Sequence, residues 1–390
     1  MNHLKTVSRH EVSDTQWDEW VGELSDSHWL HSAAMLRYYD AFDPGGPADR
    51  SFAVFDASGQ LVAVCPFRVS HREEAGRPMV EATFCGTPCG QPSLKFGPPN
   101  ERRRVAREVF GLIDEQCRSQ GVQRIVLRKP ATSIRTQTDP HPIYALEAQE
   151  NGYQGFAQSV LVVDLRKSQD ELLALMTSEQ RKHIRQTMRK GVSVRVRCGE
   201  TSATAELDAY FAAYRHAHFL SAGRNTRPEK TWELMREYLE TGMATLFVAS
   251  AGEAPISFLY CGEFHGIAFG WSQVNREEYE KQYSPRHLIE WFAINHYRAR
   301  GLAFYEIGER FKCPSLWHTP TAKEITIATL KERFGGEPWP EYVFEKYYDL
   351  GLQDDVYARR YAALRTELAR VTGQAGRVAG STPRDTATTG

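Results

Sequence analysis

The chain has 390 residues, 41% of them hydrophobic and 25% charged, with a formal net charge of −1. This composition is typical of a globular protein, and the length predicts two domains. A net charge near zero excludes a global basic field for nucleic-acid binding, so such a role needs a local patch. No apolar run approaches the roughly 18 residues that span a bilayer, and the N-terminus lacks the apolar core of a signal peptide. We therefore expect a cytoplasmic protein without a membrane span.

The sequence predicts neither a metal site nor a bound cofactor. Its seven cysteines are scattered, and Cys85 and Cys89 form a lone CxxxC pair without the second pair that a zinc site needs. His216 and His218 form an HxH pair, but no close carboxylate pattern accompanies them. No GxSxG, Walker or Rossmann motif occurs.

The first half of the chain predicts helices, then a hairpin, a strand, a long helix and another strand. The turn-forming residues 57–60, Ala-Ser-Gly-Gln, separate the two strands of the hairpin. The expected elements are one or two helices within residues 14–42, strands Ser51–Asp56, Leu61–Val69 and Met79–Cys85, a helix from Glu101 to Gln120, and strand Arg124–Arg128.

The same order of elements returns later in the chain. Gly121 and Gly301 follow the two corresponding helices, and a strand comes after each glycine. The second set consists of strands Leu246–Ala249, Ile256–Gly262 and Gly266–Gln273, helix Pro285–Arg300 and strand Ala303–Ile307. This repeat of architecture predicts an α/β (α+β) protein with two domains, each a mixed β-sheet flanked by helices.

A strongly basic segment, Arg181–Arg197, lies between the two repeats. Its helical part is expected to begin after Thr177-Ser178 and to end at Gly191, which is a good capping pattern. Met176, Ile184 and Met188 lie at spacings that can form one apolar side. The cations of this helix are Arg181, Lys182, Arg185, Arg189 and Lys190. They can follow the phosphates of a nucleic acid, or they can simply form a solvated face.

The stretch from Phe304 to Phe344 carries the densest set of candidate site residues. A short apolar strand contains Glu306 near its end, and a later segment ends in Lys331 just before Phe334-Gly335-Gly336. An acid at the end of a buried strand and a lysine before a turn indicate a polar pocket, although a strand, a loop and a helix with solvated charges fit the same residues. A final amphipathic helix, Asp354–Ala369, precedes a tail of low hydrophobicity.

Three segments resemble the FemAB superfamily of tandem acetyltransferase-like (GNAT) proteins. This superfamily includes peptidoglycan bridge ligases and tRNA-dependent aminoacyltransferases of antibiotic biosynthesis. The segments are the basic helix ending in Lys-Gly-Val within Leu173–Val194, the Pro-led helix, Gly and strand of Ser284–Gly308, and TLKERFGG at Thr329–Gly336. The resemblance covers about residues 15–350. With the repeat, it predicts a GNAT-like domain at 1–165 and a second one with the catalytic cleft at 166–350. The periodicity and composition of the remaining residues predict a C-terminal helix at 351–371 and a disordered tail at 372–390.

The resemblance implies an aminoacyltransferase that forms an amide between the amino acid of an aminoacyl-tRNA and an amine of a small molecule or peptide. Lys331 then supplies positive charge for the oxyanion and the leaving oxygen, unless it is a solvated lysine at a helix end. Glu306 takes the proton of the amine or holds the amine. A structural salt bridge of Glu306 with Arg310 or Arg286 is the alternative.

The resemblance also indicates candidate tRNA-binding and substrate-binding residues. Basic side chains of the Arg181–Lys190 helix are the candidate tRNA-binding residues. The candidate substrate-binding residues are Trp271, Asn275, Tyr279, Arg310 and Phe334 in the second domain, with Arg37 on the acceptor side of the first. The chain departs from the family pattern at Leu330, where an aromatic residue is usual, and at His31, where glutamine is usual.

Two other functions fit the same fold. An acyl-CoA N-acyltransferase would carry a Gly-rich loop whose N–H groups hold the pyrophosphate. The corresponding loops, at residues 280–286 and 96–100, lack the glycine pair and contain proline, so CoA is the less favoured donor. A non-catalytic binding module with the same fold would tolerate Lys331→Ala fully.

Overall fold

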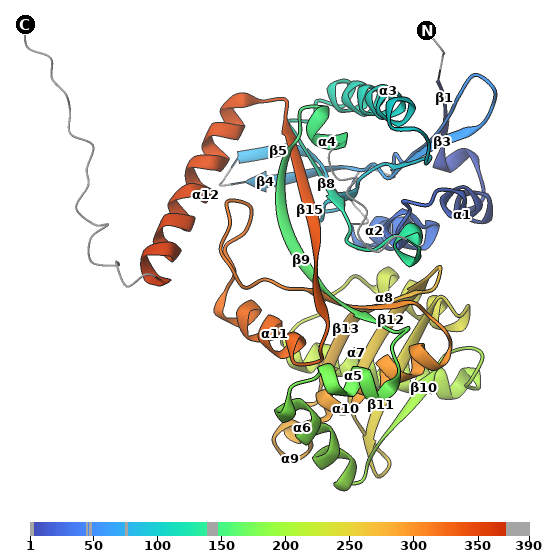
Figure 1. The fold of residues 1–390 in the computed structure, drawn as a ribbon, viewed down its shortest axis with the longest axis vertical. Helices are drawn as coiled ribbons and strands as arrows, with labels where there is room; N and C mark the ends of the chain where they lie inside the picture. The colour runs from blue at the N-terminus through green and yellow to red at the C-terminus, as the bar shows by residue number, and fades with distance from the viewer. Residues whose placement is uncertain (1–3, 44–45, 47–48, 75–76, 139–146, 372–390) are drawn as a thin grey trace, which may run out of the picture.

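Two α/β halves lie one above the other in the computed structural model, and two long strands, β9 and β15, run from one half into the other (Figure 1). The structure describes residues 4–43, 46, 49–74, 77–138 and 147–371. The predicted disordered tail at 372–390 lies outside these residues.

The first half contains the predicted hairpin, strand, long helix and strand in that order. Its elements are β1 (Lys5–Ser8), α1 (Asp14–Glu23), α2 (Ala33–Phe42), β2 (Phe52–Phe55), β3 (Leu61–Cys65), β4 (Val69–Glu74), β5 (Arg77–Ala82), β6 (Cys89–Gly90), β7 (Ser93–Leu94), α3 (Pro99–Ser119), β8 (Arg124–Lys129) and α4 (Glu147–Glu150), with 3-10 turns at Arg9–Glu11, Trp29–His31 and Ile134–Gln137. The single strand predicted at Leu61–Val69 is wrong, because it divides at Pro66 into β3 and β4. A proline cannot donate to a sheet ladder.

The second half repeats this order and adds helices around it. Its elements are β9 (Gln154–Asp164), α5 (Gln169–Leu175), α6 (Ser178–Arg189), β10 (Val192–Arg197), α7 (Thr204–Ala222), α8 (Glu229–Glu240), β11 (Ala244–Ala251), β12 (Ala254–Phe264), β13 (Ile267–Asn275), α9 (Glu277–Tyr283), α10 (Pro285–Ala299), β14 (Phe304–Glu309), α11 (Ala322–Glu332), β15 (Glu337–Tyr347) and α12 (Leu350–Val371). None of the helices described here is long and apolar enough to cross a bilayer.

One sheet continues through both halves. In the described part of the chain its strand order is β10-β11-β12-β13-β14-β9-β15-β8-β5-β4, and β6 also pairs with β8. A separate four-stranded sheet, β1-β2-β3-β7, completes the first half. Because the sheet does not end between the halves, the domain boundaries at residues 165 and 350 stay a prediction.

Strand β15 contains two prolines, which made it hard to recognise in the sequence. Pro338 and Pro340 pair with β9, whereas the ladder between β15 and β8 begins only at Tyr342. The prolines therefore lie where one edge of β15 is unpaired, and there a missing N–H group costs no ladder hydrogen bond.

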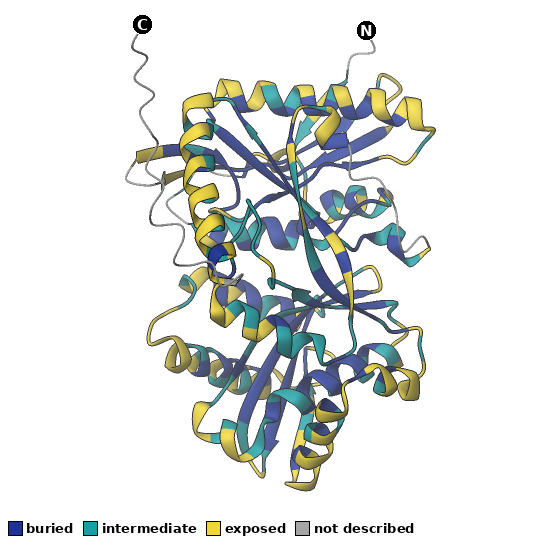
Figure 2. Ribbon diagram, turned by 60° about the vertical axis from the view of Figure 1, so that its left-hand side comes forward, coloured by how far each residue is buried: buried dark blue, intermediate teal, exposed yellow. Residues whose placement is uncertain are grey.

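Separate apolar clusters stabilise the two halves. Val105, Val109 and Ile113 of α3 pack in the first cluster, and Ile289 and Tyr297 of α10 pack in the second. Most of the central strands are buried, while α12 and the outer faces of the other helices are largely exposed (Figure 2).

Gly335 is a position where the backbone itself requires glycine. Its φ is +78°, and a Cβ atom there would lie 2.8 Å from the Cβ of Leu175 in α5. We expect Gly335→Ala to lower the free energy of unfolding by about 3 kcal/mol, since it adds a clash to the cost of a left-handed backbone. Gly301→Ala is the matched control, because Gly301 has φ +79° and open space around it. It should cost about 1 kcal/mol in the same urea-denaturation experiment, and equal losses would contradict the packing argument.

Candidate active site

The candidate site lies where the ladder between β13 and β14 ends. The two parallel strands pair from Ile267 with Phe304 to Phe269 with Glu306, and no pair follows. Beyond this point β14 continues to pair with β9. Gly270 and Trp271, which have no partner on β14, line two cavities. The end of the ladder thus brings two cavities to one place.

The larger cavity, which we call the acidic cavity, has a volume of about 390 Å³. It lies between the two halves. Its charged residues are Glu306 and Glu309 from β14, Glu341 from β15 and Arg128 from β8. Its aromatic residues are Trp29, Tyr39, Phe269 and Trp271.

Burial changes the protonation of two of these acids. Burial and the nearby Glu341 raise the pKa of Glu306 to about 8, against a hydrogen bond from Thr132 Oγ1 at 3.0 Å that favours the ionised form. Burial raises the pKa of Glu341 to about 7, although Arg128 opposes the shift. Both carboxyl groups can therefore exchange protons near neutral pH.

The smaller cavity, which we call the lysine cavity, has a volume of about 220 Å³ and contains Lys331. The Lys331 Nζ atom lies 3.4 Å from the carbonyl oxygen of Glu309. Glu290 of α10 lies in the same cavity and accepts a hydrogen bond of 2.7 Å from Tyr305 Oη. Burial raises the pKa of Glu290, while Tyr305 and then Lys331 oppose the shift.

Local sequence explains how Lys331 reaches this position. Helix α11 begins at a capping box formed by Thr321 and Glu324, and Lys331 lies in its last turn. Phe334 follows as a buried residue that also lines the lysine cavity. Helix capping and the Phe-Gly-Gly turn thus direct the lysine toward β14.

Glu306 and Lys331 lie close to the same strand, but in different cavities. Side chains alternate along a strand, so Glu306 faces the acidic cavity and Ile307 faces the lysine cavity. A Cβ atom on Gly308 would lie 2.7 Å from Lys331 Nζ, and Gly308 itself lines the acidic cavity. The predicted single cleft between the two residues is therefore a pair of cavities that meet at the end of the ladder.

The other predicted substrate-binding residues are distributed unevenly. Trp271 lines both cavities and Phe334 lines one. Arg310 lies outside them and forms an ion pair of 2.6 Å with Glu332. Asn275 accepts a hydrogen bond of 2.6 Å from Ser257 Oγ, and Tyr279 lies beside the guanidinium of Arg276. The structure thus brings two of these five residues to the cavities.

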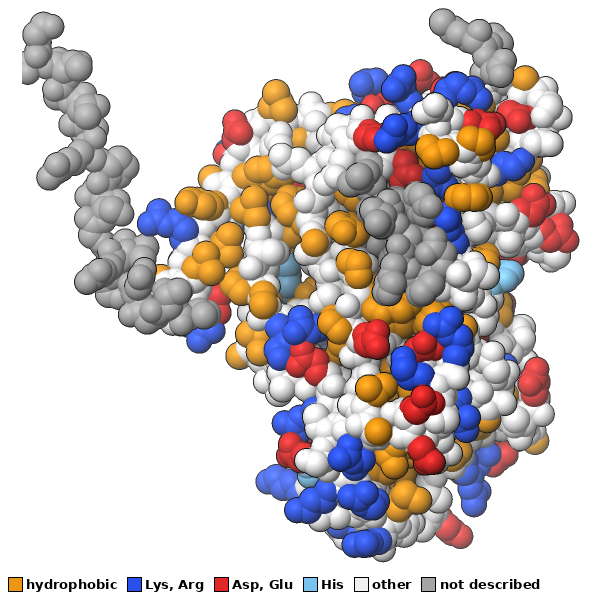
Figure 3. All heavy atoms as spheres, in the orientation of Figure 1, with side chains coloured by type: hydrophobic (Ala, Val, Ile, Leu, Met, Phe, Trp, Pro, Cys, Tyr) orange, Lys and Arg blue, Asp and Glu red, His pale blue; other side chains and the backbone are white. Residues whose placement is uncertain are grey.

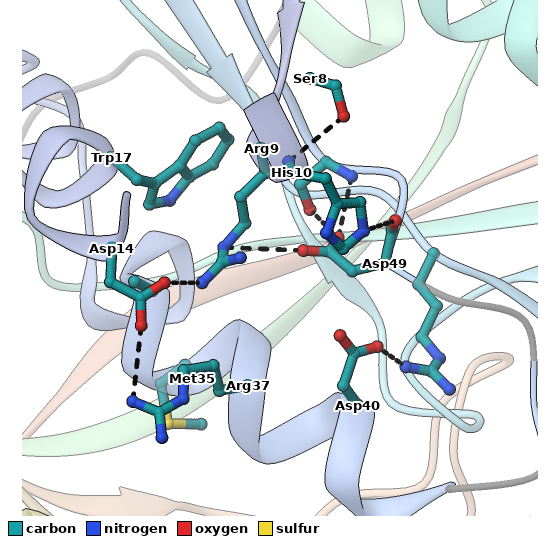
Figure 4. Close-up of polar contacts among 12 residues, drawn as sticks. Ser8, Arg9, His10, Asp14, Trp17, Met35, Arg37, Asp40 and Asp49 are labelled. Carbon is teal, nitrogen blue, oxygen red and sulfur yellow. Dashed lines mark hydrogen bonds and ion pairs between the residues drawn. The ribbon is translucent and has the colours of Figure 1, made fainter. Parts of the chain in front are cut away.

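Arg37 lies on α2 and takes part in ion pairs between helices. Its guanidinium donates to the two carboxylate oxygens of Glu237 at 2.9 and 3.0 Å. It also lies 3.4 Å from Asp14, which holds Arg9 as well (Figure 4). Arg37 lines neither cavity and connects α1, α2 and α8.

The basic helix α6 presents cations at the end of the molecule far from the first half, where Lys and Arg side chains gather (Figure 3). Lys182, Arg185 and Arg189 are exposed. Arg181 donates to the carbonyl oxygen of Met176 at 2.5 Å, and Lys190 donates to that of Gln282. The predicted apolar side is wrong at Met188, which is 57% exposed, because the buried position of this turn is Thr187.

Sequence reasoning missed Arg128, Glu290 and Glu341. The burial pattern of β15 alternates from Trp339 through Glu341 to Val343, so Glu341 lies on the inner face. This alternation was present in the sequence, but the two prolines concealed it. Glu290 has no comparable signal, because nothing in its helix distinguishes it from a solvated acid.

Residues 178–312 match the family model described as "Acetyltransferase (GNAT) domain". The structure of FemX has a TM-score of 0.62 with this chain at 12% identity, over 90% of this chain and all of FemX. The protein has a FemAB-like tandem GNAT fold. The predicted fold class is thereby confirmed.

Two further solved structures are similar to this chain over most of their length. L-PGS from Bacillus licheniformis has a TM-score of 0.54 at 12% identity, over 89% of this chain and 96% of that one. A protein of unknown function from Bacteroides thetaiotaomicron has a TM-score of 0.51 at 8% identity, over 88% and 99% of the two chains. No curated protein sequence matches the chain.

Proposed function

We propose that this protein is an acyltransferase that moves an amino acid from aminoacyl-tRNA to an amine. The observation that carries the proposal is the end of the β13–β14 ladder, where a cavity with a titrating carboxyl group meets a cavity with a lysine. Amide formation from an ester needs these two functions on opposite sides of the reacting carbonyl group.

In this proposal the ester carbonyl lies in the gap beyond Phe269 and Glu306. The amine attacks from the acidic cavity, and the Glu306 carboxylate takes the proton that the amine loses. A C–N bond forms, the ester C–O bond breaks, and the proton that the amine gave to Glu306 passes to the departing ribose oxygen. Lys331 stabilises the negative charge on the carbonyl oxygen and on the departing oxygen.

The surfaces available to bind an acyl donor favour tRNA over CoA. Helix α10 begins with Pro285, which has no N–H group, and the N–H of His287 donates to the carbonyl oxygen of Ser284 at 3.4 Å. Few free N–H groups remain there for a pyrophosphate. The exposed cations of α6 offer an alternative anion-binding surface.

Helix α6 packs beside the lysine cavity, as a tRNA-binding element should. The His183 ring stacks on His287 at 4.5 Å, and His287 in turn faces Phe334 at 6.5 Å. Glu179 of α6 forms an ion pair of 3.0 Å with Arg333, two residues after Lys331. In this proposal, the 3′ end of a tRNA bound on α6 reaches Lys331. Because the proposed donor is aminoacyl-tRNA, we also propose that the protein is cytoplasmic.

The test is a titration of the full chain with charged bulk tRNA and with acetyl-CoA at several salt concentrations. Neutralising Lys182, Arg185 and Arg189 to glutamine should reduce the slope of log affinity against log salt by about 2 to 3. The same change at Arg103, Arg104 and Arg107, exposed cations of α3, should leave the slope unchanged.

This titration, together with an assay of transfer from the charged tRNA to amines, decides between the candidate functions. Saturable CoA binding without tRNA affinity would replace the proposal with an acyl-CoA transferase of the same fold. Binding of tRNA without transfer to any amine would indicate a non-catalytic module. An equal loss of slope in both triple variants would remove α6 as the tRNA-binding element.

A further inference from the structure

The acidic cavity contains more acidic than basic side chains. Its three acids face one guanidinium, that of Arg128. Arg128 Nη1 lies 3.2 Å from Glu309, whose side chain is 39% exposed, so this pair lies toward the opening. Glu306 and Glu341 lie further inside. The positive charge nearest to both is that of Arg128, which already forms an ion pair with Glu309.

Glu341 is a buried acid in this cavity with an unsatisfied carboxyl oxygen. The residue is 3% exposed, and its Oε1 atom has no hydrogen-bond partner. The nearest guanidinium nitrogen, Arg128 Nε, lies 3.8 Å away and also lacks a hydrogen bond. A buried carboxyl oxygen without a donor costs free energy unless a ligand supplies one. Glu341 lines the cavity, so a ligand in the cavity can supply that donor.

The walls of the cavity suit an alkyl chain that carries positive charge. Trp29 stacks on Phe269 with ring centroids 4.8 Å apart, and Trp271 meets Trp29 edge to face at 4.9 Å. Tyr39 stacks on Phe84 at 4.8 Å. Aromatic rings around a cavity exclude water from methylene groups, and their faces attract ammonium groups.

We propose that the acidic cavity binds the acceptor, and that this acceptor is an aliphatic amine with two basic nitrogens. One nitrogen lies near Glu306 and the other near Glu341. The reaction of the first nitrogen rests on the proposed function, whereas the binding of the diamine does not. The second nitrogen is needed because Glu341 Oε1, which lies 3.8 Å from Arg128 Nε, still lacks a hydrogen-bond donor after Glu306 has taken a proton.

The roles of the two nitrogens differ during the reaction. The nitrogen near Glu306 gives one proton to the carboxylate and attacks the ester carbonyl as a neutral amine. A C–N bond forms, the C–O bond to the ribose breaks, and a second proton of this nitrogen passes to the ribose oxygen. The nitrogen near Glu341 remains an ammonium group and holds the chain in place. The product is a monoacylated diamine that keeps one charge.

Diamine binding should release protons, because two ammonium groups favour the ionised forms of Glu306 and Glu341. The pKa of Glu306 is raised to about 8 and that of Glu341 to about 7, so both acids are partly protonated near neutral pH. Affinity should therefore rise as the pH increases from 6 to 8. The charged and titratable groups that face the two acids are His28, Tyr39, Arg128 and Glu309.

Isothermal titration of the full chain with 1,4-diaminobutane, n-butylamine and 1,4-butanediol tests the proposal. We expect the diamine to bind at least tenfold more tightly than the monoamine and the diol not to bind. Repeating the titration at pH 7 in two buffers of different ionisation enthalpy should reveal about one released proton per diamine. Equal affinity for diamine and monoamine, or binding without proton release, would overturn the proposal.

Two variants of β15 test whether the effect on diamine binding is specific to the cavity. Glu341→Gln should lower diamine affinity at least tenfold and leave butylamine affinity unchanged. Glu337→Gln, at the exposed start of the same strand, should change neither. If Glu341→Gln fails to fold, the wild-type comparison of diamine with monoamine still decides. Diamine binding without transfer from tRNA would support the diamine site and reject aminoacyl-tRNA as the donor. Transfer from tRNA to monoamines alone would support the donor and reject the diamine site.

Discussion

Replacing Lys331 with alanine should lower kcat/KM for acyl transfer by about 10² to 10³. The ammonium group lies at the backbone of Gly308 and Glu309, next to the gap where the carbonyl oxygen would develop charge. Its loss removes a stabilising charge from the transition state rather than from substrate binding. We therefore expect kcat to fall while the affinity for tRNA changes little.

Single-turnover transfer from charged tRNA is the measurement, and Lys323→Ala is its control. Lys323 lies on the same helix and is exposed, so its removal should leave the rate unchanged. Gly308→Ala offers a second route to the same effect, because its Cβ atom would displace the Lys331 ammonium group. Full activity of both Lys331→Ala and Gly308→Ala would exclude this lysine from the chemistry.

Replacing Glu306 with glutamine should stabilise the protein at pH 8 by about 3 kcal/mol and have little effect at pH 5. The pKa of Glu306 is raised from 4.5 to about 8 in the folded protein. Between these values the unfolded chain loses its proton while the folded chain retains it, so stability falls as the pH rises. Each unit of pKa difference corresponds to about 1.4 kcal/mol, and we take a total of about 3 kcal/mol because solvent screening reduces the full shift.

Urea denaturation at pH 5 and pH 8 measures this difference. The glutamine side chain can still accept the hydrogen bond from Thr132, so the substitution mainly removes the charge. Glu337→Gln should show no difference between the two pH values, since Glu337 is exposed. A Glu306→Gln variant that is less stable at both pH values would mean that the carboxylate is stabilised in the folded protein.

Helices and strands could be predicted where the spacing of apolar residues and the positions of proline and glycine indicate the same boundaries. Helix α10 begins at Pro285 and ends before Gly301, and both residues mark the boundaries in the sequence. Strand β15 was not recognised because Pro338 and Pro340 argue against a strand until its pairing partners are known. Strand β9 was missed as well, since its first residues, Gln-Gly-Phe-Ala-Gln-Ser, carry little apolar alternation.

The candidate site was partly predictable for a similar reason. Lys331 and Glu306 belong to local motifs, so the sequence alone singled them out. Arg128 and Glu341 come from strands far apart in the chain, and only the pairing of β15 with β8 and β9 brings them together. Side chains that meet through long-range pairing leave no local signal.

The continuous sheet has a consequence for how the protein is made. Strand β8 ends at Lys129, but its partner β15 begins only at Glu337. A ribosome therefore releases most of the chain before one edge of β8 can be covered, and the nascent first half carries an open strand edge for that time. The first half expressed alone should aggregate, and deletion of the C-terminal segment should disable both halves together.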